Sequence, residues 1–365
     1  MVGLRRRILA VSSVTFVTVA VGPFAFAVDY DSVYPTEIQG TTALSGTNAW
    51  AVGTVSDGAS VLLEHWNGAS WARTSSPISG QLFAVGATSA NNVWAVGGYD
   101  VPHAHQTQSL VLHWNGSTWS RQPSPSPSTL FNPLMDVSVL SASDAWAVGY
   151  YVNSTDTSKH HSLALHWNGT KWVRVSVPGT ELYTVDAVSH TSVWAAGFHV
   201  LLHWNGVKWS TQYSHAGARF FGLSHVSSKN AWAVGDLAVL PAGAKHTYVL
   251  HWNGTKWSHV ASPSPTFYNS LTGVKAISAG NVWAIGCHGG NADCAANDTL
   301  ILHWNGTKWS KVASPHPGSK GNHLADVSAT GRTSVWAVGG DSRTQGSSRP
   351  LILHWNGSRW TTSQS

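Results

Sequence analysis

Two short apolar patterns alternate along this chain, and both are bounded by residues that favour turns. The first reads WAVG or a close variant, and it ends at Gly53, Gly97, Gly149, Gly197, Gly235, Gly286 and Gly339. The second reads HWNG, and it starts at His65, His113, His166, His203, His251, His303 and His354. These seven pairs define repeats 1 to 7, spaced by roughly 37 to 53 residues, which is typical of repeat architectures.

Each repeat is predicted to contain four short strands. The first strand carries an apolar residue twelve positions before the Trp of WAVG, and these residues are Ile38, Leu82, Leu134, Leu182, Phe220, Leu271 and Leu324. WAVG forms the second strand, the run ending in HW forms the third, and the segment after the closing Trp forms the fourth. In repeat 4 only FHVLL separates Gly197 from His203, so a minimal hairpin must join the second and third strands.

Turn residues separate the predicted strands. Two positions before the Trp of WAVG stands a residue that can hydrogen-bond its own backbone in a tight turn: Asn48, Asn92, Asp144, Ser192, Asn230, Asn281 or Ser334. The Asn-Gly of HWNG tolerates positive φ and supplies the reversal between the third and fourth strands. The NGT and NGS triplets are interpreted as turns first, and as glycosylation sequons only formally.

Four antiparallel strands in one unit cannot bury both of their faces, so each unit needs a neighbour on both sides. A closed ring provides these neighbours without long exposed edges. The fold class predicted is therefore all-β, a seven-bladed β-propeller of four-stranded antiparallel blades. The expected blades span residues 36–78, 79–129, 130–178, 179–216, 217–267, 268–320 and 321–362, within a propeller of residues 36–365.

The repeat also resembles a known family. Strands of the WAVG type that lead to a DGGxTW turn and then to an SP…L…V segment are the pattern of the photosystem II assembly-factor type of propeller, which is related to the Asp-box repeats of bacterial neuraminidases. This chain has WNGxxW in place of DGGxTW across residues 36 to 361. The resemblance implies the propeller fold only, because no neuraminidase arginine triad or Tyr/Glu pair can be mapped. A looser likeness links the WxGxxW turns to secreted bacterial lectin propellers.

The first residues predict export. MVGLRRR is a basic segment, an apolar run follows to Phe24, and Ala25-Phe26-Ala27 is a small-x-small cleavage site, so residues 1–27 are predicted to be a secretory signal peptide. An uncleaved anchor helix is the alternative. Cleavage leaves an N-terminal extension of residues 28–35 and a secreted, extracellular chain without a membrane span. Only 10% of residues are charged and no basic stripe is present, which argues against nucleic acid as a partner.

The two cysteines, Cys287 and Cys294, lie between two predicted strands of repeat 6. In an exported protein a disulfide that closes this loop is the favoured interpretation. A metal pair with His288 and Asp293 is the alternative, although no second Cys/His pair stands at ligand spacing. No cofactor and no metal are therefore predicted.

The number of Trp residues indicates the role of the repeated HWNGxxW segment. Three Trp per repeat over seven repeats give 21, and the chain contains 21 Trp. Aromatic residues at the same place in every blade suit packing between sheets, so HWNGxxW is interpreted mainly as a structural element. A lectin with one sugar site per blade is the alternative, and it requires one Trp of each triplet to face solvent.

Candidate binding residues follow from propeller topology. The loops between second and third strands differ in every repeat, and variable loops on a rigid scaffold commonly carry recognition. Tyr99, Tyr150 and Tyr151 lie there, and Tyr268 lies in the connection between repeats 5 and 6, which is expected on the same face. The residue before each first-strand apolar position should ring the mouth of the central channel: Glu37, Gln81, Pro133, Glu181, Arg219, Ser270 and His323. The alternative is that these residues are polar only because strand ends at a water-filled channel are usually polar, without any role in binding. Asp136 and Asp326, further along first strands, are candidates for water or a cation.

Three functions fit these observations. The first is an extracellular recognition or scaffold module that binds a glycan or protein through the loop face, with Glu37, Gln81, Glu181, Arg219 and His323 as candidate ligand contacts. The second is a polysaccharide hydrolase or lyase at the channel mouth, whose catalytic candidates are Glu37, Glu181, Arg219 and His323. The third is a ligand-free structural surface protein. The absence of a nucleophile motif favours the first.

Overall fold

The computed structural model describes residues 36–55, 60–102, 106–153, 156–239, 243–290, 298–319, 321–344 and 347–363. The predicted signal peptide and the extension 28–35 lie outside these residues. The described part belongs to one compact unit, residues 31–365. It consists of 26 strands joined by turns and loops, as expected for an all-β chain. None of the described segments is a helix that could span a membrane.

Four separate sheets have four strands each, in sequential antiparallel order. The first two contain β1 (Glu37–Ser45), β2 (Asn48–Thr54), β3 (Val61–Trp66) and β4 (Trp71–Arg73), then β5 (Gln81–Ser89), β6 (Asn92–Val101), β7 (Gln106–Trp114) and β8 (Trp119–Arg121). The other two contain β9 (Leu134–Ser141), β10 (Asp144–Asn153), β11 (Asp156–Trp167) and β12 (Trp172–Val175), then β23 (Gly321–Gly331), β24 (Ser334–Thr344), β25 (Ser347–Trp355) and β26 (Trp360–Ser363).

The remaining sheet has ten strands and covers repeats 4 to 6. Its strands are β13 (Leu182–Ser189), β14 (Ser192–Trp204), β15 (Trp209–Ser227), β16 (Asn230–Val239), β17 (Ala244–Trp252), β18 (Trp257–His259), β19 (Tyr268–Ser278), β20 (Asn281–Gly289), β21 (Asp298–Trp304) and β22 (Trp309–Val312). Repeat 4 is joined to repeat 5 because β15 continues from one into the other. Repeat 5 meets repeat 6 through a parallel bridge between Lys245 and Tyr268.

The minimal hairpin predicted in repeat 4 is contained in β14. Ser192 Oγ and His203 Nε2 are 2.9 Å apart, and the rings of Trp194 and His203 contact each other at 4.4 Å. Residues from the two halves of β14 therefore face each other. His199, which has a φ of 68°, lies at the reversal between them and is the one non-glycine residue with positive φ in the described part of the chain.

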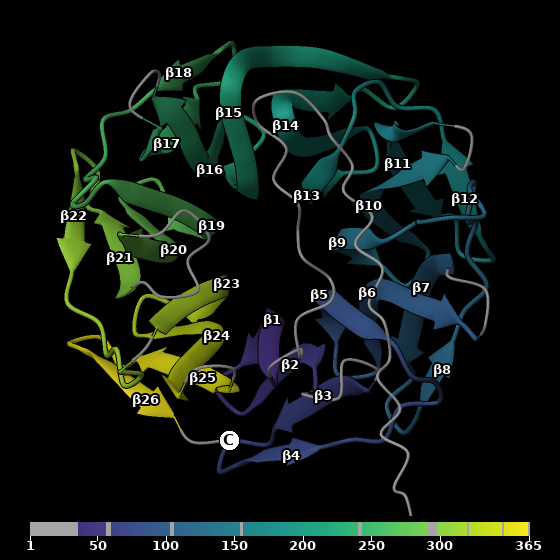
Figure 1. Cartoon of the computed structure of the whole chain (residues 1–365), viewed down its shortest axis with the longest axis horizontal. Coiled ribbons are helices and arrows are strands. Elements are labelled where there is room, and N and C mark those ends of the chain that lie inside the picture. The colour runs from purple at the N-terminus through teal and green to yellow at the C-terminus, as the bar shows by residue number, and fades with distance from the viewer. Residues whose placement is uncertain are drawn as a thin grey trace, which may run out of the picture. The chain divides into compact units, whose positions relative to one another are not determined.

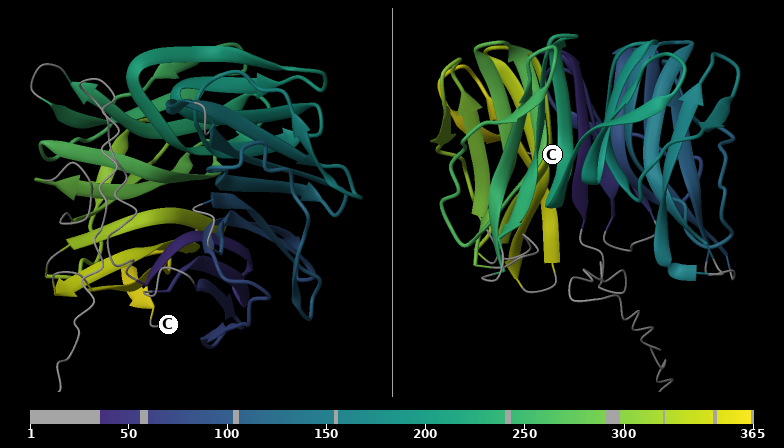
Figure 2. Two further views of the ribbon diagram at one scale, coloured as in Figure 1. Left: turned by 45° about the vertical axis from the view of Figure 1, so that its right-hand side comes forward. Right: turned by 90° about the horizontal axis from the view of Figure 1, so that it is seen from above.

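The sheets of this unit are arranged around a central axis (Figure 1). The first strand of each repeat lies innermost and the short fourth strand lies outermost, while the side view in Figure 2 shows the strands running roughly along the axis. Ile38 of repeat 1 packs in one cluster with Trp336, Val338 and Ile352 of repeat 7. Repeat 7 therefore packs against repeat 1, and this contact closes the ring.

The core lies between neighbouring sheets. Trp50 of β2 is 1% exposed, and its ring contacts Trp114 and Trp119 of the next repeat at 5.1 Å each. The corresponding contacts recur around the ring, up to Trp336 against Trp66 and Trp71. Each apolar cluster combines side chains of two adjacent repeats, which is why one repeat cannot bury its apolar faces alone.

The glycine of WAVG is required by a bulge in the facing first strand. Between Ile38 and Gly40 the register with β2 shifts by one residue, and this irregularity recurs in the other six first strands. The bulge brings the Glu37 carbonyl oxygen to 1.9 Å from where a Cβ on Gly53 would lie. The six equivalent glycines face the same obstruction at 1.7 to 2.1 Å. No side chain fits at this position.

Candidate functional site

The residues predicted at the channel mouth each stand directly before the buried apolar residue of an innermost strand. We use the name inner rim for Glu37, Gln81, Pro133, Glu181, Arg219, Ser270 and His323. Pro133 and Ser270 are buried, and the other five are partly exposed. Residues two positions apart in a strand point to the same side, and Gln39 Nε2 donates a hydrogen bond to Glu37 Oε2 at 3.0 Å.

Glu181 is the centre of one polar cluster of the inner rim. Its Oε1 is hydrogen-bonded to His160 Nδ1, and its Oε2 accepts a hydrogen bond from the Tyr183 hydroxyl. The His160 ring stacks on Tyr150 at 5.2 Å with an interplanar angle of 13°. The sequence placed Glu181 and Tyr150 in the candidate site, and the structure joins them through His160.

Glu37 belongs to a second cluster. Its Oε2 is 3.7 Å from His323 Nε2, so the first and last repeats share this ion pair when the imidazole is protonated. The side chains of Glu37 and His323 are 20% and 21% exposed. The two rim carboxylates, Glu37 and Glu181, thus have separate sets of partners.

Arg219 belongs to a third cluster, with a buried partner that the sequence analysis missed. Its Nε and Nη2 donate to the two carboxylate oxygens of Asp236 at 2.9 and 2.6 Å, a bidentate arrangement. Ser270 Oγ donates to Asp236 Oδ2 at 2.9 Å. Asp236 is 1% exposed, so this pair fixes the direction of the guanidinium. Asp236 directly follows the glycine of its WAVG copy, the position that faces the rim residue across the two strands.

A second group of residues, one per repeat, occupies the bulges. Its members are Gln39, Phe83, Met135, Tyr183, Phe221, Thr272 and Ala325, and all are partly exposed. Repeats 2 to 5 contribute Phe83, Met135, Tyr183 and Phe221, which form an apolar arc. Tyr183 stacks on Phe221 at 5.3 Å, and the Arg219 guanidinium lies 5.2 Å from the Phe221 ring centroid. Each lies two positions after a rim residue, on the same side of the strand, so alternation counted from the rim residues is the sequence signal that could have found them.

The other predicted contacts lie away from the inner rim. Tyr99 pairs with Arg121, whose guanidinium carbon is 4.1 Å from the ring centroid, and Tyr151 pairs with Arg174 at 4.9 Å. Tyr268 opens β19 opposite Lys245 and lies beside Phe267, which is 48% exposed. Cys287 is buried in β20, and Cys294 lies outside the described residues, so the disulfide remains a prediction.

Asp136 and Asp326, the candidates for water or a cation, accept hydrogen bonds from the backbone of the next repeat. Asp136 Oδ2 accepts from the Val185 nitrogen and Asp326 Oδ2 accepts from the Thr41 nitrogen, both at 2.8 Å. Burial raises the pKa of Asp136 to about 7 and that of Asp326 to about 6. The backbone nitrogens of Val137 and Val327 donate to the Oδ1 atoms at 2.7 Å, so backbone donors occupy both oxygens of each carboxylate and these residues join neighbouring repeats.

The HWNGxxW segment is mainly structural. The Trp of WAVG is 1 to 3% exposed in every repeat and the closing Trp 3 to 9%. The remaining one, such as Trp66, is partly exposed, yet its Nε1 donates to the Gly46 carbonyl at 3.0 Å and its ring contacts Trp71 and Trp336. The glycine of HWNG has a φ of 89 to 99° in all seven copies, which confirms the predicted turn.

The histidine of HWNG links strand and turn. His113 Nε2 is hydrogen-bonded to Asn92 Oδ1 at 3.0 Å, and its ring contacts Trp94 at 4.2 Å. Burial lowers the pKa of six of these seven histidines: His65, His113, His203, His251, His303 and His354. The Asn, Asp or Ser residue two positions before the Trp of WAVG is expected from the sequence to hydrogen-bond its own backbone. Its side chain instead forms a hydrogen bond with this histidine.

Together, the repeated antiparallel sheets around an axis define a β-propeller fold. Similar folds occur in YCF48 from Cyanidioschyzon merolae (TM-score 0.55, 15% identity, 89% of this chain and 98% of that chain) and in "YCF48 bound to D1 peptide" (TM-score 0.55, 13% identity, 89% and 95%). The GH74 xyloglucanase from Xanthomonas campestris is also similar (TM-score 0.60, 11% identity, 88% of this chain, 58% of that chain). No protein-family model and no curated protein matches the sequence. The resemblance to photosystem II assembly-factor propellers is confirmed as one of fold.

Proposed function

We propose that this chain is a secreted recognition propeller that binds an extracellular glycan or protein at the inner rim. The observation that carries the proposal is the apolar arc beside the Glu181 and Arg219 clusters. Stacked rings next to fixed polar groups suit the faces and hydroxyls of a sugar, or the side chains of a peptide. Tyr183, Phe221 and Arg219 are the expected central contacts.

The pairing of the rim charges supports binding over catalysis. Arg219 is fixed by Asp236 and Glu181 by His160 and Tyr183, so both present oriented groups rather than mobile ones. Preorganised groups lose little conformational entropy when a ligand binds. One structural neighbour is YCF48 bound to D1 peptide, so a propeller of similar fold binds a peptide partner.

The proposal includes seven blades. Seven WAVG glycines stand against seven bulged first strands, and this register is the same in the ten-stranded sheet as in the four separate ones. Dividing β14 at His199 and β15 before Ala218 turns the ten-stranded sheet into three four-stranded units. The three units then correspond to repeats 4, 5 and 6. Export through residues 1–27 and the Cys287–Cys294 disulfide belong to the same proposal.

A polysaccharide hydrolase is the second candidate. Glu37 and Glu181 both lie in the inner rim, and a GH74 xyloglucanase is among the structural neighbours. Two carboxylates flanking a glycosidic bond are the usual machinery of such enzymes. A reducing-end assay on soluble polysaccharides tests this function, and the expected signature is loss of activity in both Glu37→Gln and Glu181→Gln.

Binding is tested with glycan and peptide arrays probed by the purified protein. The rim variants are Glu181→Gln and Phe221→Ala, and Asp156→Asn, an exposed carboxylate in the loop before β11, is the matched control. We expect the rim variants to lose at least tenfold in affinity for the best array ligand while the control keeps it. Equal binding by all three proteins places the ligand elsewhere, and the absence of any array ligand contradicts the recognition function.

A further inference from the structure

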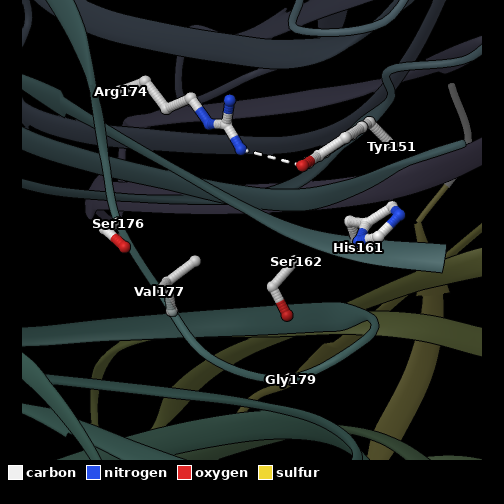
Figure 3. Close-up of a pocket in the computed structure, with 7 residues that line it drawn as sticks. All are labelled: Tyr151, His161, Ser162, Arg174, Ser176, Val177 and Gly179. Carbon is white, nitrogen blue, oxygen red and sulfur yellow. Dashed lines mark hydrogen bonds between the residues drawn. The ribbon is translucent and has the colours of Figure 1, made fainter. Parts of the chain in front are cut away.

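A pocket lies in repeat 3, and none of the inner-rim residues lines it. It has a volume of about 360 Å³ and is lined by Tyr151, His161, Ser162, Arg174, Ser176, Val177 and Gly179. These residues come from β10, β11, β12 and the connection after β12, and they surround the opening in Figure 3. The volume is within the range of about 300 to 1,000 Å³ that is common for small-molecule sites.

The pocket exists because repeat 3 departs from the sequence of its neighbours. Ser109, Ser162, Thr247 and Thr299 occupy one position, four residues before the histidine of HWNG. Ser109 Oγ donates to the carbonyls of Pro125 and Asn132, and Ser124 Oγ and Ser126 Oγ bond its backbone. Thr247 is bonded in the same way by Ser262, Pro263 and Ser264.

In repeat 3 these partners are missing. The serines that follow the closing Trp by five and seven residues in repeats 2 and 5 are replaced by Val177 and Gly179. Ser162 is 5% exposed, and its Oγ has no hydrogen-bond partner within the described residues. A buried hydroxyl without a partner is unfavourable, so a hydroxyl or carbonyl from a bound molecule would satisfy it.

The remaining lining residues indicate the chemistry of that molecule. Arg174 Nη2 donates to the Tyr151 hydroxyl at 2.9 Å, and its guanidinium carbon is 4.9 Å from the Tyr151 ring centroid. Tyr151 in turn stacks on His161 at 4.9 Å. The lining includes a cation and two aromatic rings but no acidic residue. A planar guanidinium held on a ring suits a carboxylate, and the ring faces suit the apolar side of a sugar.

We propose that this repeat 3 pocket binds a hexuronic acid residue. Its carboxylate lies at Arg174, and one ring hydroxyl hydrogen-bonds Ser162 Oγ. The site is separate from the inner rim, and it does not depend on the function proposed there. It gives the protein a charge-selective contact with acidic polysaccharides.

The test is a titration of the purified protein with D-glucuronate by ligand-observed NMR, with glucose and acetate as analogues. We expect glucuronate to bind more tightly than both. Arg174→Gln should weaken binding at least tenfold. Val177→Ser, which restores the serine of repeats 2 and 5 as a partner for Ser162, should weaken it several-fold without removing any charge.

Arg121→Gln is the matched control, because Arg121 contacts Tyr99 as Arg174 contacts Tyr151, but the serines of its own connection fill the space beside it. It should leave the affinity for glucuronate unchanged. The absence of glucuronate binding, equal binding of glucose, or equal losses in Arg121→Gln and Arg174→Gln would each overturn the proposal. Glu181→Gln and Phe221→Ala should not alter this titration, so failure at the pocket and failure at the inner rim are distinguishable.

Discussion

Asp326 and Thr41 join the two ends of the ring. The Thr41 backbone nitrogen donates to Asp326 Oδ2 at 2.8 Å, although 285 positions separate them in the sequence. The same bond joins Val185 to Asp136 between repeats 3 and 4. Innermost strands have a free edge toward the axis, and these carboxylates occupy it.

Removing this acceptor should weaken ring closure. Asp326→Ala leaves the Thr41 nitrogen unsatisfied, so we expect the free energy of unfolding to fall by about 1 to 3 kcal/mol in urea titrations. Asp298→Ala, at an exposed carboxylate at the start of β21, is the control and should be neutral. If Asp326→Ala unfolds at the same urea concentration as the wild type, the bond contributes nothing to closure.

Asp136 should make stability depend on pH. Its pKa of about 7 in the folded protein exceeds its ordinary value of 3.8, so the folded state alone holds a proton between those values. The stability that this proton provides is complete below pH 4 and is lost as pH rises through 7.

Asp136→Asn cannot titrate and should lack this dependence. From pH 5 to pH 8, the free energy of unfolding of Asp136→Asn should rise relative to the wild type by about 2 kcal/mol. Urea titrations at both pH values measure the change. The six HWNG histidines with a lowered pKa favour higher pH equally in both proteins, so their contributions cancel. A pH-independent difference would contradict the raised pKa.

Gly53→Ala should prevent stable folding. A Cβ at this position would lie 1.9 Å from the Glu37 carbonyl oxygen, and backbone atoms cannot move away as a side chain can. We expect a loss above about 3 kcal/mol, measured by thermal unfolding and soluble yield. Gly46→Ala in the same repeat is the control, since no atom lies within 4 Å of its Cβ position. Similar yields of both variants would show that the bulge can relax.

Ser162→Ala and Ser109→Ala should have opposite effects on stability. Ser109 Oγ has two carbonyl acceptors, so Ser109→Ala should lose about 1 kcal/mol. Ser162 Oγ has no partner among the described residues, so Ser162→Ala should unfold at the same or a higher temperature than the wild type. A comparable loss in both variants would mean that Ser162 is already satisfied in the absence of a ligand.

The strands and turns could be predicted because the signals for them are local and repeated. The Asn-Gly of HWNG demands positive φ, and WAVG is a continuous apolar run, as is typical of a strand buried on both faces. The count of 21 Trp also predicted inter-sheet packing, since Trp50 and its equivalents lie between repeats.

The details of the site could not be predicted, because they depend on contacts between distant residues. Asp236 is recognisable as the partner of Arg219 only once the two strands are in register, and the contact of Phe221 with Tyr183 depends on the packing of neighbouring repeats. The repeat 3 pocket arises from two absent serines. Only comparison of repeats at matched positions, here Val177 and Gly179 against Ser124 and Ser126, signals it.

The bulge after Ile38 and its six equivalents allows one strand both to pack in the core and to expose a variable residue. Residues on either side of it are held by packing between sheets and by glycine contacts, whereas the bulged residue is partly exposed and ranges from Ala325 to Phe83. Substitutions there can accumulate without loss of the scaffold. The inner face of the ring is therefore a set of seven independently variable positions, which can change ligand preference while the fold stays the same.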